Sequence, residues 1–230
     1  SFCWPRETAL IKHPMPPYQQ PEEQAREQID AMLAAAGWEV QTTKHLNLHA
    51  GRGVALCEIQ SKGGPADYML FVQGKALGIV EAKKLGTTLS AVEEQSARYS
   101  KAKQFIPQRW ADPLPFLYET TGVETHFTDQ RDPDARARAV FAFHTPEQLV
   151  ELVQQPDTLR ARLKTIPDLV TDPLRDCQVS AITHLEKSLA ANRPRALIQM
   201  ATGSGKTFTA VTQAYRLIKH AGAQRILFLV

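Results

Sequence analysis

Residues 200–207, Met-Ala-Thr-Gly-Ser-Gly-Lys-Thr, have the residue types and spacing of a phosphate-binding loop. Two glycines, Gly203 and Gly205, allow the backbone to fold around a phosphate with its N–H groups pointing inward, and a following helix N-terminus would add positive partial charge. Lys206 would reach the β- and γ-phosphates of a nucleotide, and the Thr207 hydroxyl would bind Mg²⁺. Met200 replaces the first glycine of the general pattern, but the inner turn is intact. The loop therefore predicts a nucleotide and Mg²⁺ site.

Upstream of the loop, Gln178 lies near the start of a predicted helix. A glutamine amide can donate to and accept from the adenine edge at once, which would favour ATP over GTP. Taken alone, Gln178 is an ordinary polar helix residue, but beside this loop we interpret it as an adenine ligand. The predicted ATP-binding residues are Arg175, Gln178, Thr202, Gly203, Ser204, Gly205, Lys206 and Thr207.

A second group of residues could hydrolyse a phosphodiester. Glu81 and Lys83 are two apart on a predicted strand and would project from the same face, and Asp67 lies at the head of the preceding strand. Such hydrolysis needs Mg²⁺ held by oxygen ligands, a water activated near the metal and a cation that steadies developing charge. We expect Asp67 and Glu81 to bind the metal and Lys83 to supply the cation. The alternative is a surface face of salt bridges.

Two neighbouring features favour the catalytic interpretation. The apolar residues 77–80 lead directly into Glu81, so this carboxylate would end a core strand. Gln95 and Tyr99 are an i, i+4 pair on one face of a predicted helix. They could face the metal and hold a substrate phosphate or the Lys83 side chain.

The elements that must position these residues follow from hydrophobic periodicity and turn signals. Gly37 ends the first helix, Gln73-Gly74-Lys75 suits a hairpin turn, and Ser90 with Glu93 forms a capping-box signature. The predicted helices span residues 22–36, 90–103, 174–191 and 206–220, with another starting at Thr145-Pro146. The predicted strands span residues 54–60, 67–72, 77–83, 116–120, 139–143, 196–200 and 226–230, and residues 155–172 form a polar connector.

Composition excludes several classes of protein. Hydrophobic residues are 43% and charged residues 22%, which is ordinary globular usage and argues against a disordered or fibrous chain. No apolar run approaches the length that spans a membrane, so we expect no membrane partner. The three cysteines are far apart, which favours a reducing cytoplasm over a disulfide framework. Of the net charge of +3, residues 171–230 carry +5, either as a nucleic-acid-facing surface or as a merely solvated one.

The two groups of residues resemble two known families. Gln178 with residues 200–207 resembles the first motor motifs of superfamily 2 helicases and translocases, and most closely their restriction-enzyme branch. Asp67, Glu81-Ala82-Lys83 and Gln95-x-x-x-Tyr99 resemble the PD-(D/E)xK nuclease core with the QxxxY motif of RecB-type nucleases. Ala66, inserted between Pro65 and Asp67, departs from the pattern.

In this order the motifs resemble the R, or motor, subunit of type I restriction-modification enzymes. The resemblance implies an α/β nuclease domain over residues 1–155, a linker over residues 156–172 and a truncated RecA-like ATPase domain over residues 173–230. It also implies Mg²⁺-dependent cutting of double-stranded DNA coupled to ATP-driven translocation, with methylation and specificity subunits as partners. Such nucleases often use a first-helix carboxylate too, for which Glu22, Glu23 and Glu27 are equally eligible.

Two other functions remain open at this point. The chain could belong to a helicase or a type III-like restriction subunit whose first 170 residues dock a partner. It could also be a catalytically dead module that keeps the nuclease shape and binds DNA. The chain has Lys206 and Thr207 but ends at Val230, before any strand that could supply the second acidic Mg²⁺ ligand, so we expect isolated residues 1–230 to bind ATP weakly and not to turn it over.

Overall fold

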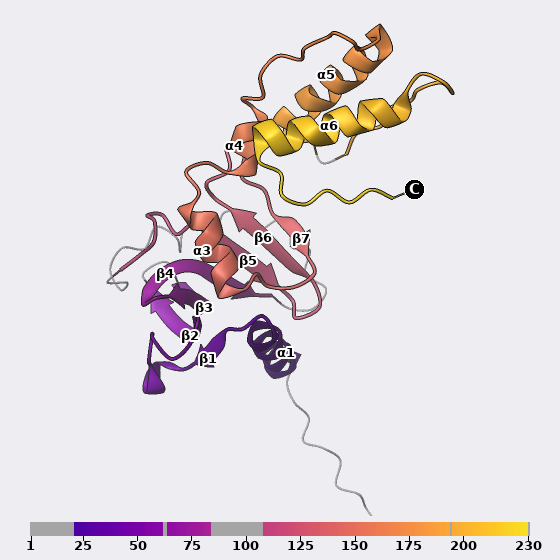
Figure 1. Ribbon diagram of the computed structural model, residues 1–230. Helices are drawn as coiled ribbons and strands as arrows, with labels where there is room; N and C mark the ends of the chain where they lie inside the picture. The colour runs from indigo at the N-terminus through magenta and orange to yellow at the C-terminus, as the bar shows by residue number, and fades with distance from the viewer. Residues whose placement is uncertain (1–20, 62–63, 84–107, 194, 230) are drawn as a thin grey trace, which may run out of the picture.

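The computed structural model describes residues 21–61, 64–83, 108–193 and 195–229 (Figure 1). Within them, a mixed sheet of seven strands is ordered β1 to β7 in chain sequence, parallel at β1–β2 and β4–β5 and antiparallel elsewhere. The strands are β1 Glu39–Gln41, β2 Val54–Ser61, β3 Gly64–Val72, β4 Lys75–Ala82, β5 Phe116–Thr120, β6 Thr125–Asp129 and β7 Arg138–Val140. The protein is therefore of the mixed α/β class.

The hairpin predicted between β3 and β4 is confirmed. Val72 pairs with Lys75, which leaves Gln73 and Gly74 as a two-residue turn. Their φ angles are 52° and 73°, and a type I′ turn requires positive φ at both positions. The register of the pair then shifts by one residue between Leu70 and Phe71, so that Tyr68 lies opposite Val80 farther along the strands.

Helix α1, Pro21–Ala35, covers one face of the sheet and matches the predicted first helix. Ile29 and Leu33 are fully buried in a core that includes a row of four register partners across β3 to β6. The row is Tyr68, Val80, Tyr118 and Phe127. Apolar side chains also fill the opposite face, among them Met69, Ile79 and Leu117. The central strands are thus buried on both faces.

Helix α3, Pro146–Gln154, begins where Thr145 and Pro146 predict. Thr145 and Gln148 form a reciprocal capping box. Within the predicted connector, Thr158 caps a short helix α4, Leu159–Leu163, which the sequence analysis did not predict. Leu159 and Leu163 are one helical turn apart, a signal too short for periodicity to reveal.

The last part of the chain departs further from prediction. Helices α5, Asp176–Ala190, and α6, Lys206–Ala221, form where predicted. The strands predicted at 196–200 and 226–230 are wrong for every described residue, since these segments belong to no strand. Leu197 is 93% exposed and Leu229 is 86% exposed. A strand needs a neighbour for its backbone N–H and C=O groups, and the described residues place none beside either segment.

Smaller differences concern the sheet edges. The strand predicted at 139–143 is the shorter β7, and the sequence analysis missed β1, β6 and the short 3-10 helix η1, Thr43–His45. The helix predicted at 90–103 lies outside the described residues. No described helix has both the length and the apolar character needed to cross a bilayer.

Candidate catalytic and nucleotide-binding sites

The predicted phosphate loop leads directly into the N-terminus of α6. Gly205 occupies the N-cap with φ 85°, and Gly203 has φ 79°. Both values lie in the left-handed region that favours glycine. A Cβ atom at position 205 would lie 2.3 Å from the Gln178 amide nitrogen. Glycine is therefore needed there both for its backbone conformation and for space.

Gln178 and Arg175 converge on this loop from the start of α5. The Gln178 side chain is almost fully buried, with 4% exposed. Its Oε1 accepts from the Arg175 backbone N–H at 2.9 Å, and its Nε2 donates to the Ser204 carbonyl at 3.1 Å. The Arg175 guanidinium donates to the Gly203 carbonyl at 3.2 Å. The amide thus holds the loop in this conformation, and contact with adenine would require it to exchange partners.

Lys206 and Thr207 are exposed at the mouth of the loop. The Lys206 ammonium donates to the Ala201 carbonyl at 3.3 Å, folding back on its own loop. The Ser204 hydroxyl donates to the same carbonyl at 2.7 Å. Lys206 must leave this carbonyl to reach a phosphate.

The other predicted site begins at the end of β4. Glu81 is buried, with 6% exposed, and the Lys83 ammonium forms an ion pair with its Oε1 atom. The Lys83 backbone N–H donates to the Thr120 carbonyl at 2.7 Å, so the neighbouring strand β5 fixes its position. The structure therefore brings the predicted Glu81 and Lys83 together, with Glu81 buried and Lys83 partly buried.

Asp67 is described for its backbone alone. Tyr68 pairs with Val80, and one further step of this antiparallel register brings Asp67 opposite Glu81. Whether the two carboxylates bind one metal stays a prediction, because the Asp67 side chain lies outside the described part. Gln95 and Tyr99 also lie outside the described residues, so their roles stay predictions too.

Sequence reasoning missed two residues beside Glu81. Glu119, 5% exposed, is its register partner on β5, and His126 is the partner of Glu119 on β6. Register partners share a face, and the adjacent row, which contains Tyr118, packs into the core under α1. The row of Glu81, Glu119 and His126 therefore faces away from α1. One sequence signal could have identified Glu119. Like Glu81, it is a charged residue near the end of an apolar strand.

Oxygen donors at these positions fit a hard cation such as Mg²⁺. Among the described side chains, no three His, Cys, Asp or Glu residues are close enough together to bind a metal ion by themselves. A metal at Glu81 would therefore need the undescribed Asp67 side chain or a ligand from the substrate or solvent. At the phosphate loop, the exposed Thr207 hydroxyl is available as a single ligand.

The chain matches two protein families over different segments. Residues 38–153, just over half of the chain, match the family described as the second domain of the type I restriction enzyme EcoKI endonuclease subunit. The chain belongs to this family. The match contains β1 to β7 and nearly all of α3, and it includes both Glu81 and Lys83. Residues 171–230, which contain the phosphate loop, match the family described as the type III restriction enzyme res subunit.

Two curated relatives are similar over most of the chain. The type I restriction enzyme EcoKI endonuclease subunit of Escherichia coli (strain K12) is 30% identical over 260 residues, covering 91% of the chain and 22% of the relative. The EcoAI endonuclease subunit of Escherichia coli is 25% identical over 209 residues, covering 84% and 25%. The chain thus spans about a quarter of the length of these type I relatives.

A solved fragment from Vibrio vulnificus YJ016, assigned as an HsdR subunit of a type I restriction enzyme, is also similar. It is 21% identical with a TM-score of 0.41, and the match covers 86% of the chain and 38% of that fragment.

Proposed function

We propose that the chain is the nuclease part and the ATP-binding start of the motor of a type I restriction subunit. In this proposal residues 1–155 are a PD-(D/E)xK nuclease domain, residues 156–172 a linker and residues 173–230 the beginning of a RecA-like ATPase domain. The whole subunit would cut double-stranded DNA with Mg²⁺ while ATP-driven translocation pulls the DNA in. The observation that supports this best is the ion pair of the buried Glu81 with Lys83, within the segment that matches the type I family.

In the nuclease site the acidic and basic residues would have different roles. Glu81 and Asp67 would bind Mg²⁺, which would polarise the phosphodiester and lower the pKa of a bound water. Lys83, fixed at the end of β4 by the Thr120 carbonyl, would place its ammonium against the charge that develops on the phosphate. Gln95 and Tyr99 would hold the substrate phosphate or the Lys83 side chain. Glu119 would add a second buried carboxylate beside Glu81.

The nucleotide site would work through exchange of partners. A triphosphate would draw Lys206 away from the Ala201 carbonyl, and Thr207 would ligate the Mg²⁺ that accompanies ATP. The Gln178 amide would exchange its hydrogen bond with the Ser204 carbonyl for hydrogen bonds with the adenine edge. The remaining loop residues, Thr202, Gly203, Ser204 and Gly205, would surround the phosphates, with Arg175 behind them. We expect residues 1–230 to bind ATP without hydrolysing it.

Partners and location follow from the family. The subunit would act in the cytoplasm on double-stranded DNA, together with methylation and specificity subunits. These subunits would determine which DNA sequence is recognised.

A metal titration tests the nuclease assignment. Residues 1–230 would be titrated with Mn²⁺ by calorimetry, beside Asp67→Asn, Glu81→Gln and the control Arg52→Gln, which alters an exposed ion pair with Glu147. We expect one site that is lost in the first two variants and kept in the control. Binding that survives both carboxylate variants would contradict the assignment.

The match of residues 171–230 to the type III res subunit favours a second candidate. In it the chain serves a helicase or a type III-like restriction subunit, and the sheet is a non-catalytic DNA-binding or docking module. Such a module needs no metal at Asp67 and Glu81. Absence of Mn²⁺ binding in the unmodified chain would therefore favour this candidate.

A further inference from the structure

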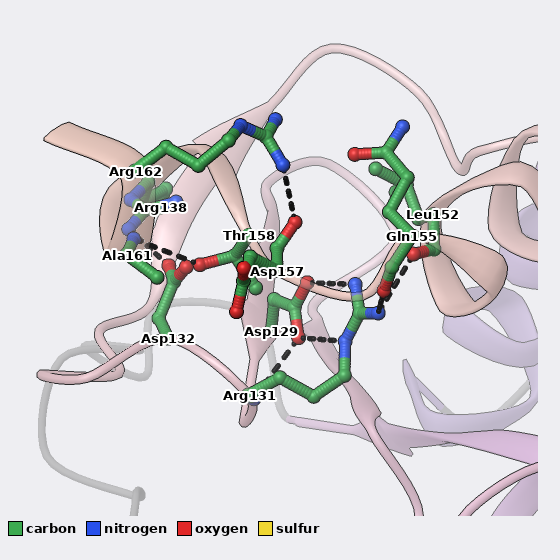
Figure 2. A network of polar contacts seen from close by, with 10 residues as sticks. All are labelled: Asp129, Arg131, Asp132, Arg138, Leu152, Gln155, Asp157, Thr158, Ala161 and Arg162. Atoms are coloured by element: carbon green, nitrogen blue, oxygen red, sulfur yellow. Dashed lines mark hydrogen bonds and ion pairs between the residues drawn. The ribbon is translucent and has the colours of Figure 1, made fainter. Parts of the chain in front are cut away.

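The loop between β6 and β7, residues 130–137, is held to the end of α3 by a partly buried arginine. Arg131 makes a bidentate ion pair with Asp129, at 3.0 Å from Nε to Oδ1 and 2.7 Å from Nη2 to Oδ2 (Figure 2). Its Nη1 donates to the Leu152 carbonyl at 2.7 Å. Farther along, Arg138 pairs with the buried Asp132 at 2.7 Å. Both ends of the loop are therefore fixed.

The middle of the same loop contacts the connector and α5. The Asp134 carboxylate accepts from Lys164, directly after α4, at 2.9 Å. The Asp134 carbonyl accepts from the Asn192 side-chain amide at 2.9 Å. Asn192 lies just past the end of α5. The loop between β6 and β7 thus contacts the residues that directly follow α4 and α5.

Helix α4 is in turn joined to α6. The Arg162 Nε donates to the carbonyl of Ala221, the last residue of α6, at 2.7 Å. Another nitrogen of Arg162 donates to the Asp157 carbonyl (Figure 2). The connector also accepts a hydrogen bond through the Pro167 carbonyl from Arg216, a buried residue of α6. Arg216 is paired with Glu186 of α5, so both helices are included.

These contacts differ in what they can contribute. The Lys164–Asp134 pair is exposed, with 40% and 57% of the side chains accessible, and such pairs contribute little. The carbonyl contacts of Arg162 and Asn192 and the buried Arg216–Glu186 pair fix geometry more strongly, because a buried polar group that loses its partner is costly. Flexible linkers lack such contacts.

We propose that residues 129–167 with Asn192 form a fixed joint, which holds the sheet and helices α5 and α6 in one orientation. Residues 156–172 then act as a docked bridge, not as a flexible tether. Figure 1 shows α4 between the sheet and these two helices. Because α6 carries Lys206 at its first residue and meets Arg162 at its last, a nucleotide at the loop would act on a helix whose far end is joined to the sheet. This last consequence rests on the proposed function, but the joint itself does not.

Distances between spin labels test the joint directly. Residues 1–230, with the three natural cysteines replaced by alanine, would be labelled at Val123→Cys and Val211→Cys, two exposed positions on either side of the joint. The test variant combines Arg162→Gln with Asn192→Asp, since aspartate tolerates the positive φ of position 192. The matched control is Arg52→Gln, in an exposed pair outside the joint.

We expect one narrow distance distribution in the parent and in the control. In the test variant the distribution should be at least about twofold wider, as for domains on a flexible linker. A broad distribution in the parent, or an unchanged one in the variant, would overturn the proposal. If circular dichroism shows that the double variant has lost helix, Asn192→Asp alone decides by the same two outcomes. The measurement uses no DNA, metal or nucleotide, so its result is independent of the proposed function.

Discussion

At the scale of single residues, the buried Glu81 carboxylate is the feature that most needs explanation. Its charge is expensive to bury unless a cation or hydrogen-bond donors lie close to it. Lys83 supplies a cation from the same strand, two residues later. The ion pair with Lys83 therefore offsets part of the cost of burying the Glu81 carboxylate.

Replacing Lys83 with methionine should destabilise the fold. The variant keeps the length of the side chain but removes the ammonium from Glu81, and we expect the free energy of unfolding to fall by roughly 1.5–3 kcal/mol, as for a hydrogen bond to a charged group. Urea unfolding measures this change. Lys44→Met, at an exposed lysine of η1, is the control and should change it by less than about 0.5 kcal/mol. Equal effects of the two substitutions would refute the buried-pair argument.

His144 should make stability depend on pH. Burial, followed by the nearby Arg225, lowers the pKa of this imidazole below its ordinary value of about 6.5. Burial also raises the pKa of the Tyr118 hydroxyl, which stays protonated 2.6 Å from the His144 Nδ1. The folded chain thus binds the imidazole proton less tightly than the unfolded chain does. Stability contributed by neutral His144 is complete above about pH 6.5 and is lost as pH falls through the folded-state pKa.

Thermal unfolding between pH 7.5 and pH 5 checks this expectation. The melting temperature should fall with pH in the parent and fall less steeply in His144→Asn, whose amide nitrogen can occupy the position of Nδ1. A parent curve no steeper than that of the variant would contradict the role of His144.

At the scale of elements, strong local signals predicted the structure well. The Gln73-Gly74 turn, the Thr145 cap and the amphipathic α1 are each specified by neighbouring residues, and all form as expected. The predicted strands at 196–200 and 226–230 fail because an apolar run becomes a strand only beside a partner. For the same reason periodicity could not show that β5 places Glu119 beside Glu81, since pairing between distant strands leaves no local mark.

The two glycines of the phosphate loop, Gly203 and Gly205, differ in how much space an added side chain would have. Gly205→Ala would drive a Cβ into the Gln178 amide, whereas a Cβ at position 203 would meet nothing within 4 Å. Both residues have positive φ, so backbone strain of roughly 1 kcal/mol is common to the two substitutions. We therefore expect Gly205→Ala to weaken ATP binding at least about tenfold more than Gly203→Ala, a difference of about 1.4 kcal/mol.

Equilibrium binding of a fluorescent ATP analogue measures this difference. Gly203→Ala is the matched control, because the two variants share the backbone strain of a positive φ. Equal affinities for the Gly203 and Gly205 variants would show that Gln178 does not support the loop.

At the scale of the whole molecule, the two sites lie in parts of the chain that match two restriction-enzyme families. Glu81 and Lys83 belong to the central sheet, whereas Gln178, Lys206 and Thr207 belong to α5 and α6 beyond α4 (Figure 1). We assign phosphodiester cleavage to the first group and ATP binding to the second. A change in the sheet site should therefore leave the nucleotide chemistry intact.

The most direct test measures DNA cutting and ATP hydrolysis together in the full-length subunit assembled with its partners. We predict that Glu81→Gln lowers cutting at least about 100-fold, because a metal ligand supports several kcal/mol of transition-state stabilisation. ATP hydrolysis should stay within about twofold of the parent, a change of less than 0.5 kcal/mol in the barrier. Lys206→Ala, the reciprocal control, should abolish ATP hydrolysis. A well-folded Glu81→Gln subunit that still cuts DNA, or that loses ATP hydrolysis together with cutting, would contradict the assignment of two separate sites.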